Sequence, residues 1–307
     1  MTPPRELGRV RGDRPGPSFV AVAGLHGNEP AGLEAGTRVL AALQDGQVPV
    51  AGELVVLSGN RKALGLARRY LDKDLNRQWT VARIAALLSR PASLDDAEDA
   101  EQRELLVALE ATVARSRGPL HLADLHTSSA PGIPFAMLGE APAQQRFLRA
   151  FHVPVILGLE PLLVGVLSRH FAGQGWATFA VEGGQHTDPQ AVDSLEAVLW
   201  LTMAEAGLVE ADLAEVARSA ALLERRCDGL PRVLEVLDRR SISEEDAFVM
   251  EPGFRNIEPA RRGQLLARDA SGEIRAPDDG VVILPLYQGQ GSDGYFWGRV
   301  VSEQAPP

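Results

Sequence analysis

The sequence predicts an α/β protein, with a sheet covered by helices on both faces and a small all-β module at the C-terminal end. Two observations predict this class. Up to about Arg225, apolar runs of strand length alternate with segments of helical spacing, the pattern of a helix-covered sheet. From about Leu230, glycine, proline and aspartate separate short strand candidates, and no long helical pattern follows. A chain of 307 residues fits one large and one small domain, which we place at residues 1–228 and 229–307.

Hydrophobic spacing predicts the elements of the first region. Short, nearly continuous apolar runs predict strands that are buried on both faces. These runs are Ser18–Leu25, Glu53–Ser58, His121–His126, Pro154–Leu159 and Trp176–Glu182. Apolar residues three and four positions apart predict helices. These segments are Gly32–Gln44, Thr80–Leu88, Ala97–Ser116, Ala143–Phe151, Pro189–Glu205 and Ala211–Arg225.

The second region contains five short strand candidates. Turn-forming residues lie between them, as in small β modules. The candidates are Arg232–Leu237, Phe248–Glu251, Gly263–Arg268, Gly280–Leu286 and Gly294–Val301.

Composition and charge limit the possible partners and surroundings of the chain. A net charge of −10 argues against a nucleic-acid partner, which requires a basic face. The single cysteine, Cys227, excludes a disulfide within the chain. Residues 1–14 lack the apolar core of a signal peptide, and no apolar stretch is long enough to span a bilayer. We therefore expect a cytoplasmic protein that does not bind a membrane.

The run His26-Gly27-Asn28-Glu29 lies where the first buried strand is expected to end. Gly24 and Gly27 would let the backbone turn sharply, so that the histidine and the carboxylate face one point. His126 ends a second predicted strand about a hundred residues later. Two histidines and one carboxylate form a catalytic zinc set with an open fourth position, although other first-row metals could also occupy it. The alternative is that these are unrelated polar residues on separate loops.

Two carboxylates accompany the candidate ligands. Asp124 and His126 would point to the same face of one strand, so Asp124 could assist the site. Glu182 ends a further apolar strand, at the sheet edge where α/β proteins bind their ligands. It could act as a general base beside an activated water, or it could be a surface residue before a loop. His186 follows closely and could enter the site.

A loop dense in charge, Arg69–Arg77, follows the second predicted strand. Within it, Asn76 and Arg77 form a set of hydrogen-bond donors that suits a substrate carboxylate. A solvated charged loop is the alternative interpretation. The remaining histidines have no paired ligand nearby in the sequence, and we expect them to be structural or exposed: His121, His152 and His170.

Taken together, these segments resemble the succinylglutamate desuccinylase and aspartoacylase family, a branch of the zinc carboxypeptidase-like hydrolases. The resemblance runs from about Phe19 to Val301, because the family also appends a β module. The matching segments occur in the family's order and approximate spacing: Gly24–Glu29, Asn60–Arg61, Arg69–Arg77, Asp124–Thr127 and Val181–Glu182.

The resemblance implies a mixed central sheet of the zinc carboxypeptidase type and one zinc ion. The implied zinc ligands are His26, Glu29 and His126. Glu182 would be the catalytic carboxylate, and Arg69 would polarise the scissile carbonyl. Asn76 and Arg77 would hold the α-carboxylate of the substrate. Tyr287 is implied as a contact from the β module, and we add Arg169 as an expected second cation for the substrate.

The predicted activity is zinc-dependent hydrolysis of an N-acyl amino acid, of the N-succinyl or N-acetyl acidic type. The residues that read the acyl group in the family do not map clearly onto this chain, so the acyl group stays open. Two alternatives are a zinc carboxypeptidase acting on short peptides and a non-catalytic, metal-dependent binding protein. The expected partner is a small molecule, and a homo-oligomer is possible.

Overall fold

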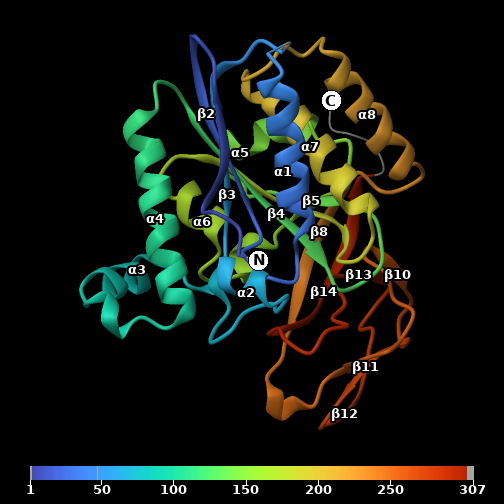
Figure 1. The fold of residues 1–307 in the computed structure, drawn as a ribbon. Helices are drawn as coiled ribbons and strands as arrows, with labels where there is room; N and C mark the ends of the chain where they lie inside the picture. Colours follow the sequence, from blue (N-terminus) through green and yellow to red (C-terminus); the bar gives the residue numbers. More distant parts are fainter. Residues whose placement is uncertain (1, 47, 303–307) are drawn as a thin grey trace.

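The computed structural model describes residues 2–46 and 48–302, and its centre is a large mixed sheet (Figure 1). Among these residues, eleven strands form that sheet, and three more form a small antiparallel sheet. In spatial order, the large sheet contains β1 (Glu6–Arg11), β3 (Ala51–Ser58), β2 (Arg14–Ala23), β4 (Leu120–Ser128), β7 (Ala177–Gln185), β5 (Phe135–Met137), β6 (Val155–Leu157), β8 (Val233–Ser241), β14 (Asp293–Ser302), β13 (Gly280–Ile283) and β10 (Glu258–Ala260). The small sheet contains β12 (Gly272–Arg275), β11 (Leu265–Asp269) and β9 (Val249–Met250).

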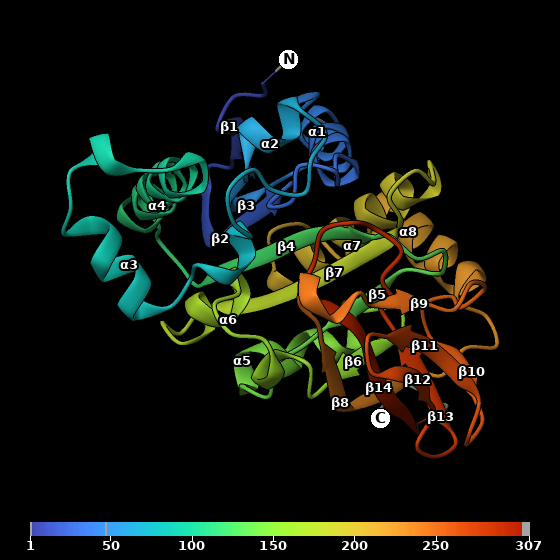
Figure 2. The same cartoon turned by 90° about the horizontal axis from the view of Figure 1, so that it is seen from below.

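Four parallel strands, β3, β2, β4 and β7, form the part of the sheet that carries the candidate site. Seen from below, β4 and β7 run side by side through the middle of the molecule (Figure 2). Their registers align the carboxyl ends, with Ala23 of β2 opposite Leu125 of β4, and His126 of β4 opposite Glu182 of β7. Residues that follow these strands therefore meet at one edge of the sheet.

Helices cover both faces of these parallel strands (Figure 1). The second half of β2 is apolar because both of its faces are buried. Phe19 and Ala21 pack into one core, and Val20 and Val22 pack into the other. The first core is covered by α1 (Ala31–Gln44), α7 (Gln190–Ala206) and α8 (Ala214–Arg226). The second is covered by α3 (Val81–Leu88), α4 (Ala97–Arg115) and α6 (Leu167–Ala172). The mixed, helix-covered sheet predicted from the sequence is thus confirmed.

Short helices connect these elements. They are α2 (Arg61–Gly65), α5 (Pro142–Gln145) and the single 3₁₀ turns η1 (Leu75–Arg77), η2 (Ala92–Leu94), η3 (Arg146–Arg149), η4 (Glu160–Leu162) and η5 (Glu244–Asp246). No helix in residues 2–46 and 48–302 is long and apolar enough to cross a membrane.

Four of the C-terminal strands extend the central sheet, and only the other three form a separate small sheet. β8 pairs in parallel with β6, and β14, β13 and β10 follow in antiparallel order. One hydrophobic cluster crosses this seam, since Phe135 and Ile156 pack with Leu234 and Phe296. The orange and red segment in Figure 2 therefore borders β6 directly within the sheet. The division at residues 228 and 229 stays a prediction.

Several elements differ from the sequence-based expectation: α2, α6, β10 and β12 were not predicted, and three further differences have a physical reason. β1 was not predicted, because its charged, half-exposed sequence occupies an edge of the sheet, where apolar alternation is weak. β5 was missed because it has three residues. The helix predicted over Ala143–Phe151 is divided into α5 and η3, which end at Arg149.

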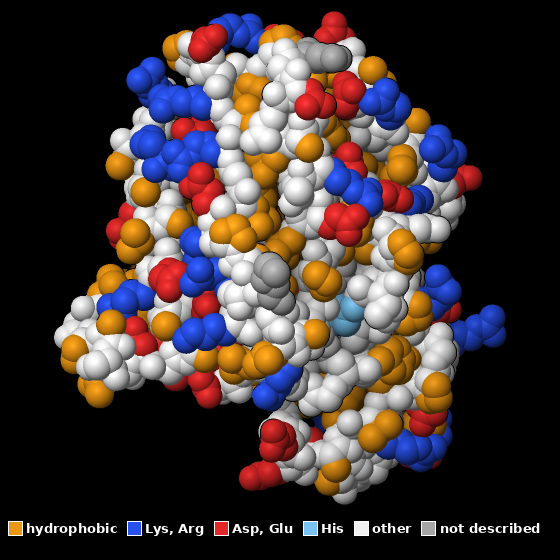
Figure 3. Space-filling view, viewed as in Figure 1, with side chains coloured by type: hydrophobic (Ala, Val, Ile, Leu, Met, Phe, Trp, Pro, Cys, Tyr) orange, Lys and Arg blue, Asp and Glu red, His pale blue; other side chains and the backbone are white. Residues whose placement is uncertain are grey.

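Acidic and basic side chains are mixed on the face drawn in Figure 3. Arg38 of α1 illustrates the local pairing, since it lies 2.6 Å from Glu34 on its own helix and 3.0 Å from Asp193 of α7. Such exposed pairs contribute little to stability, at about 0–1 kcal/mol each.

Candidate active site

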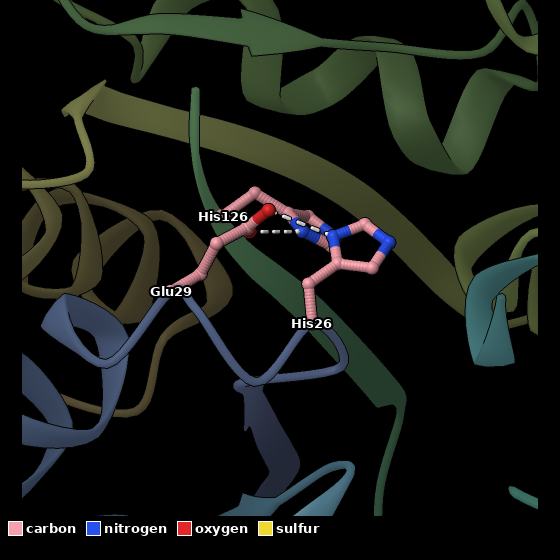
Figure 4. Close-up of side chains that lie close together, drawn as sticks. All are labelled: His26, Glu29 and His126. Carbon is pink, nitrogen blue, oxygen red and sulfur yellow. Dashed lines mark hydrogen bonds and ion pairs between the residues drawn. The ribbon is translucent and has the colours of Figure 1, made fainter. Parts of the chain in front are cut away.

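His26, Glu29 and His126 converge at the carboxyl edge of the parallel strands (Figure 4). The Nδ1 atom of His26 lies 2.8 Å from Oε1 of Glu29, and the Nδ1 atom of His126 lies 2.9 Å from Oε2. All three side chains are buried, and one potential ligand atom from each lies within 4.8 Å of the others. Two imidazole nitrogens and a carboxylate oxygen form the donor set of a catalytic metal site, so these residues could hold a metal ion.

The turn after β2 depends on two glycines. Gly24 has a φ of +70°, a conformation that glycine adopts without strain. A Cβ atom on Gly27 would lie 2.1 Å from the carbonyl carbon of Ala63, so no side chain fits there. Asn28 braces the turn by donating a hydrogen bond of 2.8 Å to Oε1 of Gln288. The chain therefore brings His26 and Glu29 to one point from positions three residues apart.

Each candidate histidine ligand has a carboxylate against its second ring nitrogen. Nε2 of His26 lies 3.3 Å from Oδ1 of Asp74, and Nε2 of His126 lies 2.9 Å from Oδ1 of Asp124. Carboxylates in this position orient a metal-binding imidazole and fix its tautomer. They leave both Nδ1 atoms facing Glu29, which supports the fit of a metal ion at this point.

The ligand cluster has strongly perturbed ionisation. Burial opposes the ionisation of Glu29, but His26 and His126 outweigh it and hold the pKa of that carboxyl well below its usual value. Burial also opposes a charge on His126, yet the Asp124 and Glu29 carboxylates hold the pKa of its imidazole well above the usual value. Asp74 behaves like Glu29, since His26 and Arg69 outweigh burial and lower its pKa strongly.

Glu182 lies beside the ligands, because β7 places it directly opposite His126 of β4. Its side chain is buried, and its Oε2 atom has no hydrogen-bond partner among the described residues. Burial, followed by the nearby Glu29 charge, raises the pKa of the Glu182 carboxyl to about 8. A raised pKa in a cleft is typical of a general base or acid that works near neutral pH.

The loop from Arg69 to Arg77 is held in place by Glu98 of α4, which is fully buried. Its carboxylate accepts hydrogen bonds from the backbone N–H groups of Leu71 at 2.8 Å, Asp72 at 2.9 Å and Lys73 at 3.2 Å. It also accepts one of 2.8 Å from Nδ2 of Asn60. Glu98 thus accepts the hydrogen bonds that these backbone N–H groups would otherwise donate to water. It also fixes the loop residues on either side of Leu71–Lys73.

This loop brings Arg69 and Asn76 to the ligands. Arg69 lies 3.2 Å from Oδ2 of Asp74 and 3.5 Å from Oε1 of Glu29. Asn76 donates to Oδ2 of Asp124 at 3.2 Å, while its own Oδ1 accepts from the N–H of Leu167 at 2.8 Å. Both side chains are therefore held in defined positions beside the candidate metal centre.

A cavity opens onto the ligands. Two parts of its lining differ, and we name them here. The metal wall consists of His26, Glu29, Arg69, Asp124, His126 and Glu182. The apolar wall consists of Met137, Leu159, Leu163, Leu284, Leu286 and Phe296.

Arg77 lies in the cavity lining, and the predicted contacts Arg169 and Tyr287 do not. Nη1 of Arg169 donates to backbone carbonyls instead, with the nearest, that of Leu163, at 3.1 Å. The hydroxyl of Tyr287 donates to the carbonyl of Glu251 at 2.7 Å. The structure therefore does not place either residue in the lining of this cavity. The β module does reach the cavity, through the neighbouring residue Gln288.

Several residues of the site carry no recognisable signal in the sequence. Glu98 looks like a surface residue of a charged helix, and Asp293 looks like a turn residue before a strand. His186, which was considered for the site, accepts or donates a hydrogen bond of 2.8 Å with Oγ1 of Thr127 and stays outside the lining. His121 is buried in the core, as expected, and stacks on Phe19.

The fold and the site together define an α/β protein with a candidate His–Glu–His metal centre and a buried acid at the carboxyl edge of its sheet. This arrangement is typical of metal-dependent hydrolases. The chain belongs to the succinylglutamate desuccinylase/aspartoacylase family, because the model of that family's catalytic domain matches residues 15–199.

Individual relatives agree with this assignment. The chain is 30% identical over 261 residues to a succinylglutamate desuccinylase of Burkholderia thailandensis, a match that covers 82% of this chain and 70% of the relative. The solved structure of a succinylglutamate desuccinylase from Vibrio cholerae has a TM-score of 0.64 at 18% identity, covering 94% of this chain and 84% of that one. The product-bound ectoine utilization protein EutE (DoeB) from Ruegeria pomeroyi has a TM-score of 0.62 at 18% identity, covering 95% and 87%. At such identities the two structures show a common fold.

Proposed function

We propose that this chain is a zinc-dependent amidohydrolase that cleaves an N-acyl amino acid into a carboxylate and a free amino acid. The observation that carries the proposal is the convergence of His26, Glu29 and His126 beside the buried acid Glu182. Membership in a family whose relatives are named as desuccinylases supports the reaction type. The N-acylated acidic amino acids expected from the sequence are one group of such substrates. The charges of the cavity lining bear on whether the protein accepts them.

The roles of the chain's residues follow from their positions. Zinc bound by His26, Glu29 and His126 would polarise the scissile carbonyl and lower the pKa of a water molecule towards 7. Glu182 would take a proton from the attacking water and deliver it to the nitrogen of the leaving amine. The guanidinium of Arg69 would donate hydrogen bonds to the carbonyl oxygen as negative charge develops there, an effect typically worth about 3–4 kcal/mol.

Arg77 and Asn76 are the proposed substrate-binding residues. Arg77 lies in the cavity lining next to Asn76 and presents a charged donor that suits the α-carboxylate of an amino acid. Binding that carboxylate would orient the amide towards Glu182 and so reduce the entropy lost in the reaction.

The test combines metal analysis with a substrate panel. The purified protein should contain about one zinc ion per chain, and a chelator should abolish hydrolysis until zinc is restored. The panel contains N-acetyl amino acids, N-succinyl amino acids and dipeptides. Hydrolysis of dipeptides alone would support the carboxypeptidase alternative. Metal binding without hydrolysis of any compound would support the non-catalytic alternative and overturn the proposal.

A further inference from the structure

The cationic side chains of the cavity are already paired with carboxylates of the protein. Among the described residues, Arg69 and Arg77 are the only lysine or arginine side chains in the lining. Arg69 lies between Asp74 and Glu29, at 3.2 and 3.5 Å. Nη2 of Arg77 lies 2.7 Å from Oδ2 of Asp293. Each guanidinium in the lining therefore already has a protein carboxylate beside it, which limits the positive charge left for a substrate with several carboxylates.

Asp293 lies between two arginines, Arg77 and Arg239, and the three side chains together carry one net positive charge. Its Oδ1 atom lies 2.5 Å from Nε of Arg239, while Oδ2 contacts Arg77. The three side chains are 14–22% exposed, so water screens their charges only in part. Two arginines and one aspartate carry a net charge of +1. The buried Nε atom of Arg77 has no hydrogen-bond partner among the described residues. This cluster can thus balance and contact one substrate carboxylate, but not two.

The opposite side of the cavity offers no lysine or arginine side chain, among the described residues, for a second carboxylate. The apolar wall contributes only hydrocarbon and thioether surface. The charged residue beside it in the lining is Glu160, an acid whose carboxylate lies near the amide of Gln144, at 3.5 Å. Burial raises the pKa of the Glu160 carboxyl, because it outweighs the hydrogen bond from Gln144 and the charge of Arg169. A substrate carboxylate here would lose its hydration without gaining a cationic partner, and it would also lie near the acid Glu160.

We propose that the preferred substrates are N-acyl amino acids with a single carboxylate, whose acyl group and side chain are both uncharged and mainly apolar. N-succinyl amino acids and N-acylated aspartate or glutamate would be poor substrates. This inference rests on the proposed function, because it assigns the substrate class of the same cavity.

Matched substrate pairs test the inference on the unaltered, metal-loaded protein. N-butyryl and N-succinyl derivatives of one amino acid have chains of similar length and differ by one charge. N-acetylmethionine and N-acetylglutamate provide the same contrast on the amino acid. We expect kcat/KM to be at least about 100-fold higher for the uncharged member of each pair, because the buried second carboxylate stays unpaired. Equal or higher kcat/KM for the dicarboxylates would overturn the inference.

A variant pair assigns the preference to Asp293. Asp293→Asn would leave the two arginines with a charge of +2, so the preference for the uncharged substrate should fall about tenfold. Asp238→Asn removes the same charge from an exposed position of β8, and it should keep the preference of the unaltered protein. An unchanged preference in Asp293→Asn would remove this residue from the explanation. If that variant does not fold, the matched substrates still decide the inference on the unaltered protein.

Binding separates failure of the inference from failure of the proposed function. Glu182→Gln should bind N-acetylmethionine more tightly than N-acetylglutamate in calorimetry, whether or not the protein hydrolyses either compound. Tighter binding of N-acetylglutamate would overturn the inference alone. If the unaltered protein hydrolyses no compound of the panel, while Glu182→Gln binds N-acetylmethionine more tightly, only the proposed function would be overturned.

Discussion

The metal wall and the apolar wall line one cavity, but they are built by different means. On the metal wall, most polar atoms are held by partners, as with Glu98 behind the Arg69 loop and Asp124 behind His126. The apolar wall collects one or two side chains each from β5, the residues flanking η4, the segment between β13 and β14, and β14 itself. The contrast suggests that the first wall determines the reaction and the second determines which molecule undergoes it. Substitutions in the two walls should therefore affect different kinetic constants.

The largest effect is expected on the metal wall. Glu182→Gln keeps the shape of the side chain and removes the base, so kcat should fall about 100- to 10,000-fold. Metal content should stay at the level of the unaltered protein, because Glu182 is not a proposed ligand. Element analysis and steady-state kinetics on the same sample provide the check. Retained turnover would exclude Glu182 as the base.

An intermediate effect is expected from Glu98, which lies behind the metal wall and does not line the cavity. Glu98→Gln loses the charge that accepts three backbone N–H groups, so the free energy of unfolding should fall by about 1–3 kcal/mol. We expect kcat/KM to fall about 10- to 100-fold, because Arg69 and Asn76 would lose their fixed positions. Glu110→Gln, on the exposed face of the same helix, is the control for charge. Equal behaviour of the two variants would contradict the anchoring role.

A smaller effect is expected on the apolar wall. Leu163→Ala removes apolar contact surface, so KM for substrates with a bulky apolar group should rise about tenfold. Metal content should not change, since Leu163 directly follows η4 and is not one of the proposed metal ligands. Leu94→Ala truncates an exposed leucine and serves as the matched control. A fall in kcat at constant KM would contradict the separation of the two walls.

Two histidines of β4 provide a second comparison between a polar and an apolar environment, this time within one strand. His126 faces carboxylates, while His121 lies among aromatic rings, 6.0 Å from the ring of Phe19 and 5.7 Å from that of Phe147. Burial, followed by the charge of Arg146, lowers the pKa of His121 to about 4 from a usual value of 6.5. Between about pH 4 and pH 6.5, His121 of the unfolded chain binds a proton that His121 of the folded chain does not bind. The free energy of unfolding should therefore fall as the pH falls, by up to about 1.4 kcal/mol per pH unit.

His121→Phe should remove this contribution and should leave the metal content unchanged. Urea unfolding at pH 7.5 and pH 5 measures it, and the variant should lose less stability between the two pH values than the unaltered protein. The same pH dependence in both proteins would show that His121 is protonated equally in the folded and unfolded states.

The metal wall could be predicted from the sequence because its residues lie at strand ends and next to glycines. His26, Glu29, His126 and Glu182 all follow from the position of an apolar run, and the parallel registers bring them together. The apolar wall could not be predicted, since each contributing segment supplies one or two ordinary hydrophobic residues. Tyr287 illustrates the difficulty. Its neighbours Leu286 and Gln288 line the cavity, whereas the Tyr287 side chain lies outside the lining and its hydroxyl donates to the carbonyl of Glu251.

The continuation of the sheet from β6 into β8 has a consequence for how such proteins diversify. The segment that matches the family's catalytic domain ends at residue 199, whereas Leu284, Asp293 and Phe296 complete the cavity from beyond it. The proposed catalytic groups thus lie on the matched stretch, whereas the residues that line the substrate cavity come from both stretches of the polypeptide. Exchange of the later stretch between relatives would be a direct route to new substrates, with the catalytic groups left untouched.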